Sequence, residues 1–200
     1  MRRLFFLVPC TTAVLVLSSC SPRDFLTRRL AADLIVASDT FRATQQLQLR
    51  TGIVSNQDYF STESLVLQHR GWISATQARC PADIAPPPCW DVSLTPSGVD
   101  TFRPLLPADE AGQQTFSIPA AKRELVAVTG ISKLSRAADV EFICRWIPLN
   151  EVGAVLYSAE ARYRSTAAFR CYDDGWRVVQ GASHPSQPLD ESLKNAEPVP

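Results

Sequence analysis

The stretch Val140-Glu141-Phe142-Ile143-Cys144-Arg145-Trp146 decides the fold that the sequence predicts. From Val140 to Trp146, every second residue has an apolar side chain or a thiol. A strand repeats every two residues, so these side chains would share one face and the charged ones would point to the other. We therefore expect a strand over 139–147 with one face buried in a core.

Further strand and turn signals lie on both sides of this predicted strand. Asp173-Asp174-Gly175 predicts a tight hairpin, because glycine readily adopts the positive φ angle that such a turn requires. From 181 to 200 the chain has four prolines and no apolar periodicity, which predicts a disordered tail. Residues 104–180 should then form an antiparallel β-meander, with further strands near 114–118, 122–129, 154–164, 167–172 and 176–180.

The N-terminal half, residues 20–103, carries the signals of short helices. Ser21-Pro22 predicts a helix start, and Leu26, Leu30 and Leu34 recur at helical spacing, so we expect a helix over 22–37. The stretch 43–50 supports either a helix or an edge strand, and we slightly favour the strand.

A helix, a hairpin and a helical turn should follow. Ser61 can cap a short helix that runs to Arg70 and stops at Gly71. Trp72-Ile73 and residues 90–94 resemble two short strands, and a helical turn should begin at Thr95.

Residues 1–19 have the three-part pattern of an export signal. Met1-Arg2-Arg3 is positively charged, and a mainly apolar run follows to Leu17. At its end, Leu17-Ser18-Ser19-Cys20 resembles the lipobox of bacterial lipoproteins. The resemblance implies that Cys20 becomes the first residue, carries diacylglycerol and a further acyl chain such as palmitate, and attaches the chain to membrane lipid in the periplasm.

The residue after the lipid site bears on the choice of membrane. An Asp there would favour the inner membrane in enteric bacteria, and this chain has Ser21, so we expect the outer membrane with the inner membrane as the alternative. An ordinary signal peptide or membrane anchor remains the alternative to lipidation. Arg23, Arg28 and Arg29, near the anchor, predict either a solvated helix face or contacts with lipid headgroups.

Four cysteines remain beyond Cys20, an even number that favours two disulfides in an exported chain. One pair brackets the proline-rich loop 81–88, and the other lies on the core-facing sides of two strands. We therefore expect the disulfides Cys80–Cys89 and Cys144–Cys171. The alternatives are free thiols at 144 and 171, or a zinc site, for which the usual short ligand spacings are missing.

Charge and pattern bear on nucleic-acid binding. The segment Arg70-Gly71-Trp72-Ile73, followed by Val92-Ser93-Leu94-Thr95-Pro96-Ser97-Gly98, resembles the wing of winged-helix regulators. The resemblance concerns shape over residues 70–98. With 20 basic and 20 acidic residues the chain has no net charge to attract a polyanion, so we expect no nucleic-acid partner.

The sequence carries few groups for catalysis. It has two histidines, His69 and His184, and eight glycines that form no phosphate-binding motif. Asp173 and Asp174 are adjacent in a turn and cannot face each other across a substrate. We therefore expect no catalytic residues, no cofactor and no metal.

The sequence thus predicts an α+β protein: an N-terminal helix, a small winged-helix-like helix and hairpin subdomain, and an antiparallel β-meander. Trp72 and Trp90 flank the cysteine loop and are candidate ligand contacts, whereas Trp146 and Trp176 fit core positions.

The expected function is a non-catalytic scaffold or protein-binding module of the cell envelope, with a possible envelope protein as partner. The alternative is a small-ligand-binding module with a tryptophan-lined pocket between the halves. A third hypothesis is an enzyme that uses carboxylates which cannot be recognised from their spacing in the sequence. A scaffold predicts an exposed apolar patch, and a ligand-binding module predicts a concave apolar pocket.

Overall fold

A computed structural model of the 200-residue chain describes residues 25–81, 87–106, 115–180 and 188–199. It mixes helices with antiparallel sheets, as expected for the α+β class. In chain order the elements are α1 (Arg28–Ala37), α2 (Asp39–Arg42), β1 (Gln45–Arg50), β2 (Gly52–Ser55), α3 (Asn56–Tyr59), α4 (Thr62–His69), β3 (Ile73–Ala78), β4 (Cys89–Leu94), α5 (Pro96–Phe102), the 3₁₀ turn η2 (Arg103–Leu105), β5 (Thr115–Leu134), β6 (Ala137–Pro148), α6 (Glu151–Leu156), β7 (Arg162–Tyr172), β8 (Gly175–Val178), α7 (Leu189–Lys194) and β9 (Glu197–Val199).

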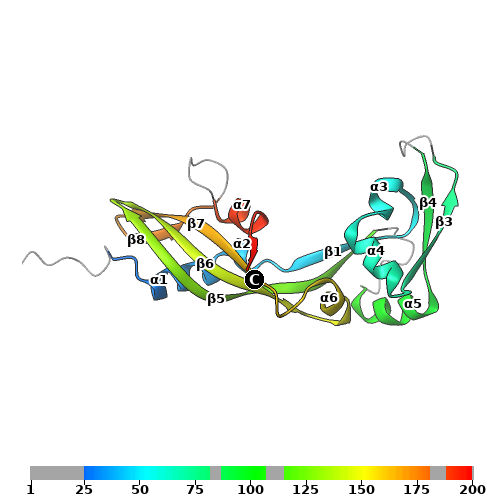
Figure 1. Ribbon diagram of the computed structural model, residues 1–200, viewed down its shortest axis with the longest axis horizontal. Coiled ribbons are helices and arrows are strands. Elements are labelled where there is room, and N and C mark those ends of the chain that lie inside the picture. The colour runs from blue at the N-terminus through cyan, green and yellow to red at the C-terminus, as the bar shows by residue number, and fades with distance from the viewer. Residues whose placement is uncertain (1–24, 82–86, 107–114, 181–187, 200) are drawn as a thin grey trace, which may run out of the picture.

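The two sheets lie toward opposite ends of an elongated molecule (Figure 1). The larger sheet has the order β1-β5-β6-β7-β8, and β9 also pairs with β7. The smaller has the order β2-β4-β3. Strand β5 is 20 residues long, so at about 3.3 Å per residue it spans roughly 60 Å and enters both lobes.

The larger sheet and helices α1, α2 and α7 form what we call the sheet lobe. Val140 and Phe142 are fully buried in its core and Cys144 is nearly so, which confirms the alternation expected over 139–147. Trp176 is buried here too, as expected, whereas Trp146 is half-buried. Both ends of the described chain contribute, since Leu26 and Leu189 belong to the same core.

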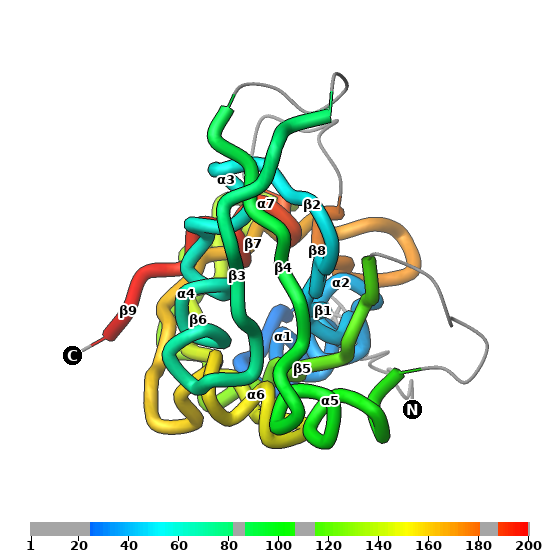
Figure 2. Tube along the Cα trace, turned by 90° about the vertical axis from the view of Figure 1, so that its right-hand side faces the viewer, coloured from blue at the N-terminus to red at the C-terminus, as the bar shows by residue number. Residues whose placement is uncertain are grey.

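The smaller sheet and helices α3, α4 and α5 form the disulfide lobe, which Figure 2 shows end-on. Its core includes Leu67 and Phe102, together with Leu47 of β1, Ile118 of β5 and Val152 of α6. The order β2-α3-α4-β3-β4 places the expected strand pair in register, with Ile73 opposite Leu94 and Ala78 opposite Cys89.

The expected boundary between 20–103 and 104–180 does not separate the two cores. The described chain begins in the sheet lobe with α1 and β1, crosses to the disulfide lobe, and returns along β5. Strand β1 joins the larger sheet because Leu47 and Leu49 bury their side chains beside Ile118 and Phe116 of β5. The strand favoured over 43–50 is therefore confirmed as β1.

The first helix begins later than expected. Thr27, and not Ser21, caps α1, since its hydroxyl accepts the Leu30 amide at 3.1 Å; residues 21–24 lie outside the described part. Ala31 and Ile35 are fully buried, whereas Leu30 and Leu34 are half-buried at the edge of the stripe.

The strand expected over 154–164 is wrong over 154–161, and only its last three residues belong to β7. Asn150 accepts the Gly153 amide at 2.9 Å and caps α6, so the chain turns helical before β7 begins. The strands expected at 114–118 and 122–129 are one strand, β5, which passes two register shifts against β6 between Leu125 and Gly130. The Asp173-Asp174-Gly175 hairpin is confirmed, with Gly175 at φ 130°.

The C-terminal segment is ordered where it is described, which corrects the expected disordered tail. Leu189 of α7 is fully buried against the sheet lobe. The Ser165 hydroxyl of β7 donates to the Ser192 carbonyl at 2.8 Å and also hydrogen-bonds its hydroxyl. A helix of six residues has little amphipathic signal, so packing rather than periodicity specifies it. Residues 181–187 and 200 lie outside the described part.

The expected Cys144–Cys171 disulfide is wrong, and both cysteines are free thiols. The parity argument holds, because both side chains belong to or pack against the sheet-lobe core. The register between β6 and β7 keeps the two sulfur atoms too far apart to form a disulfide. Cys144 pairs with Tyr163, and Cys171 lies eight residues further along β7, so the Cα atoms are roughly 26 Å apart where a disulfide allows at most about 7 Å.

Candidate protein-binding surface

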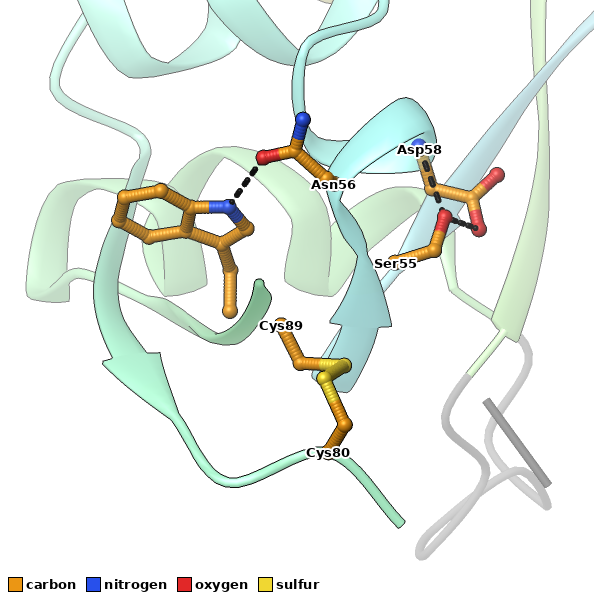
Figure 3. Close-up of a disulfide and its surroundings, with 6 residues drawn as sticks. Ser55, Asn56, Asp58, Cys80 and Cys89 are labelled. Carbon is orange, nitrogen blue, oxygen red and sulfur yellow. Dashed lines mark hydrogen bonds between the residues drawn. A yellow bond between two sulfur atoms is a disulfide. The ribbon is translucent and has the colours of Figure 1, made fainter. Parts of the chain in front are cut away.

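The turn from β2 into α3 positions the first part of the surface. The Ser55 hydroxyl accepts the Asp58 amide at 3.1 Å and donates to the Asp58 carboxylate at 3.0 Å, which caps this one-turn helix (Figure 3). Arg50 Nη1 lies 2.8 Å from the same carboxylate. These contacts hold Tyr59 and Phe60 at the end of α3.

Three aromatic side chains, Tyr59, Phe60 and Trp90, form what we call the aromatic cluster. The Trp90 indole stacks on Tyr59 with ring centroids 4.6 Å apart and meets Phe60 edge-on at 5.8 Å. Its N–H donates to Asn56 Oδ1 at 3.0 Å (Figure 3). Tyr59 is buried, Trp90 is half-buried and Phe60 is 51% exposed. The cluster therefore presents a braced apolar edge to solvent.

The disulfide Cys80–Cys89 closes the loop between β3 and β4, which confirms that pairing. Its Cα atoms are 5.2 Å apart, and Cys89 is fully buried while pairing with Ala78 and Ser55 on either side (Figure 3). Because Trp90 follows Cys89 directly, the bond also fixes the strand that carries the indole.

The two tryptophans predicted as ligand contacts, Trp72 and Trp90, differ in their exposure to solvent. Trp72 is only 5% exposed and packs edge-on against Phe102 at 5.9 Å, so its expected place on the surface is wrong. It directly precedes β3 and lies against the start of α5, where its carbonyl accepts the amide of Thr95, the residue that caps α5. Trp90 alone of the two retains an accessible edge.

A cleft of about 360 Å³ lies between β1, helices α3 and α4, and Tyr157. Neither Trp72 nor Trp90 lines it. Its walls combine apolar side chains with amides, hydroxyls and charged groups, including Gln45, Gln48, Gln57, Ser61 and Glu63. This cleft could hold a polar ligand through hydrogen bonds, but not one stacked between tryptophans.

A half-buried cation lies where the two lobes meet. The Arg123 guanidinium covers the Trp146 ring at 4.5 Å and donates to the Thr40 carbonyl at 3.2 Å. Burial lowers the pKa of Arg123, and burial raises the pKa values of Cys144 and Tyr157. The thiol and the phenol are therefore held neutral beside a positive charge.

The structure does not describe the expected lipid attachment site. Cys20 and His184 lie outside the described residues. Within the described ranges no three His, Cys, Asp or Glu side chains gather as a metal site would require, and no helix is both long and apolar enough to cross a bilayer.

Comparison with protein-family models, with characterised proteins and with solved structures finds no match for this chain. The surface therefore has to be interpreted from its own chemistry.

Sequence reasoning missed Asn56, Tyr59 and Phe60. The adjacent aromatic pair Tyr59-Phe60 was the available signal, but only the pairing of β2 with β4 brings it to Trp90.

Proposed function

We propose that this chain is a membrane-anchored periplasmic lipoprotein of the outer membrane and a non-catalytic protein-binding module. In this proposal Cys20 carries the lipid, and the aromatic cluster binds an envelope protein that presents an apolar segment. The observation that carries it is the exposed edge of Phe60 on a covalently clamped lobe. Aromatic side chains held rigidly at a surface are typical anchors of protein interfaces.

The arrangement of the lobes supports this role. The described chain begins at Phe25 at one end of the molecule, and the aromatic cluster belongs to the lobe at the other end (Figure 1). Strand β5 extends between them for roughly 60 Å. A lipid on Cys20 would thus leave the disulfide lobe well away from the bilayer, where a partner could reach it.

The anchor is tested first. Intact-mass measurement of the membrane fraction should give the mass of the chain from residue 20 plus its acyl groups, less two hydrogens for the one disulfide. A Cys20→Ser variant should no longer be retained by the membrane. An unmodified sulfur, or unchanged retention of the variant, would overturn the lipoprotein proposal.

The partner site is tested by site-specific crosslinking. A photoreactive phenylalanine analogue at Phe60 should crosslink one envelope protein in intact cells, and an additional Trp90→Ala change should weaken that product. The same analogue at Val36, which is 45% exposed on α1 of the sheet lobe, is the matched control. Equal products from both positions, or none from position 60, would contradict the proposal.

A small-ligand-binding role is the second candidate, and the cleft beside Tyr157 favours it in a changed form. Its amides and hydroxyls would suit a neutral polar ligand. Native mass spectrometry of the purified chain should then reveal a retained small molecule that is lost on Gln48→Ala substitution.

The winged-helix likeness remains a proposal about shape. The strand order β2-β4-β3 and the two helices between β2 and β3 support it.

A further inference from the structure

Three exposed apolar side chains mark the end of the sheet lobe where the described chain begins. Leu134, the last residue of β5, is 81% exposed beside the turn into β6. Phe25, just before α1, is 59% exposed, and Tyr172, at the turn between β7 and β8, is 45% exposed. We call this end, made of residues 25–29, 132–139 and 168–178, the tip surface. In Figure 1 these two turns and the start of α1 lie together.

Contacts between the segments make the tip one surface. Lys133 Nζ lies 5.4 Å from the Phe25 ring and 5.1 Å from the Trp176 ring, so it joins the N-terminal segment to both hairpins. Arg136 forms an ion pair with Asp173 at 2.9 Å, and its carbonyl accepts the Cys171 amide at 2.8 Å. The apolar side chains are therefore held at a common end.

Charge is distributed unevenly between this end and the rest of the chain. All nine ionisable Lys, Arg and Asp side chains of the tip surface are exposed: Arg28, Arg29, Lys133, Arg136, Arg170 and Arg177 against Asp139, Asp173 and Asp174. This excess of three positive charges contrasts with the remainder of the chain from residue 20, which has 12 basic and 17 acidic residues. A chain with no net charge thus has one basic end.

We propose that the tip surface rests on a bilayer containing anionic phospholipid, with Leu134, Phe25 and Tyr172 entering the headgroup region. This inference deepens the proposed lipoprotein function and rests on it for the position of the bilayer. Cys20 precedes Phe25 by five residues, which can span at most about 18 Å. A lipid on Cys20 therefore keeps the tip within reach of the membrane.

The chemistry of the tip fits a lipid surface. Aliphatic and aromatic side chains inserted at the interface, surrounded by Arg and Lys, are the usual composition of interfacial membrane contacts. Each basic residue near an anionic leaflet strengthens binding about fivefold. A protein partner at this end would compete with the anchored membrane for the same space, so the bilayer is the occupant that the anchor itself supplies.

The test uses the chain from residue 20 with Cys20→Ser, which has no lipid of its own and retains every helix and strand described here. It is sedimented with vesicles of equal parts phosphatidylglycerol and phosphatidylcholine, and with phosphatidylcholine alone. We expect the chain to bind the anionic vesicles. Binding should fall about tenfold on Leu134→Asp and at least about thirtyfold on the double change Arg28→Glu and Arg29→Glu. On phosphatidylcholine alone, binding of the parent chain should be weaker by at least about thirtyfold. Thermal unfolding by circular dichroism verifies that each variant folds.

Matched changes in the disulfide lobe and beside α6 are the controls. Arg70→Glu with Arg79→Glu carries the same charge reversal at exposed positions, and Leu149→Asp the same apolar loss at a residue that is 45% exposed. These should bind as the parent does. If the chain did not bind anionic vesicles, or if tip and control variants lost binding equally, the proposal that the tip surface contacts the bilayer would be wrong. The mass of native Cys20 is a separate measurement, so a bare sulfur would instead overturn the anchor.

Discussion

In the sheet lobe, strands of up to 20 residues pair along their length, and helices from both ends of the described chain cover the core. In the disulfide lobe, strands of four to six residues form a three-stranded sheet, and the helices have at most eight residues. Small cores bury less surface per residue, so covalent links matter more to them. The disulfide lies in the lobe with the shorter elements, and the sheet lobe keeps two free thiols.

The largest expected effect comes from a matched pair of core phenylalanines, one in each lobe. Phe142 packs edge-on against Phe41 at 6.5 Å in the sheet lobe, and Phe102 against Trp72 at 5.9 Å in the disulfide lobe; both are fully buried. Phe142→Ala and Phe102→Ala should each lower the free energy of unfolding by about 3–5 kcal/mol. Chemical denaturation monitored by circular dichroism measures this.

The same pair shows whether the lobes unfold together. Because β5 contributes to both cores, we expect Phe102→Ala to reduce amide-exchange protection first in β3 and β4, and then along β5 into the sheet lobe. Leu65→Ala, at a residue 42% exposed on α4, should change the stability little. Unchanged protection throughout β5 in the Phe102 variant would mean that the lobes are independent.

Reduction of Cys80–Cys89 should have the next largest effect and should be confined to one lobe. The short loop that it closes would contribute about 3 kcal/mol on the chain-entropy model. We expect dithiothreitol to increase amide exchange in β3 and β4 while β6 and β7 stay protected. The control is a Cys80→Ala variant with Cys89→Ala, in which dithiothreitol should cause no further change. Equal loss of protection in both lobes would contradict the comparison.

The contrast between the lobes also explains which parts were predictable from sequence. Local signals were reliable: the Ser61 cap, the helix start at Thr95, the stop at Gly71 shortly after α4 and the 173–175 hairpin each depend on a few neighbouring residues. The alternation in β6 likewise predicted which side chains are buried. Such features are decided within one turn or one strand.

Features that depend on register could not be predicted. Parity placed Cys144 and Cys171 on the same side, but the distance along β7 that separates them is set by the pairing of β6 with β7. The aromatic cluster could not be predicted for the same reason, since Trp90 contacts Tyr59 only through the β2–β4 pairing. The site was therefore half-predictable: its cysteines and Trp90 were identified, whereas Asn56, Tyr59 and Phe60 were not.

A smaller effect is expected at the glycine where α6 contacts β5. A Cβ atom on Gly153 would lie 1.9 Å from the Ala120 carbonyl oxygen, so α6 must move for alanine to fit. Gly153→Ala should lower the free energy of unfolding by about 1–3 kcal/mol. Gly130→Ala is the matched control, because its Cβ would find its nearest neighbour at an ordinary 3.7 Å. Denaturant midpoints that move equally in both variants would show that α6 is not closely packed.

The smallest effect concerns the thiol that the sheet lobe leaves unbonded. Burial raises the pKa of Cys144 above the ordinary value of 9.0. Above that pH the unfolded thiol loses its proton while the folded one keeps it, so stability present at lower pH is lost as the pH rises toward the folded pKa, by up to about 1.4 kcal/mol per pH unit. Denaturant unfolding at pH 8 and pH 10 should therefore show a larger loss of unfolding free energy in the parent chain than in Cys144→Ala.

Cys171→Ala removes the other free thiol, which is only half-buried, and is the control; its stability should fall with pH as the parent's does. If the stability of Cys144→Ala also fell in this way, the loss would have to come from another group, of which Tyr157 is the nearest candidate because burial raises its pKa as well.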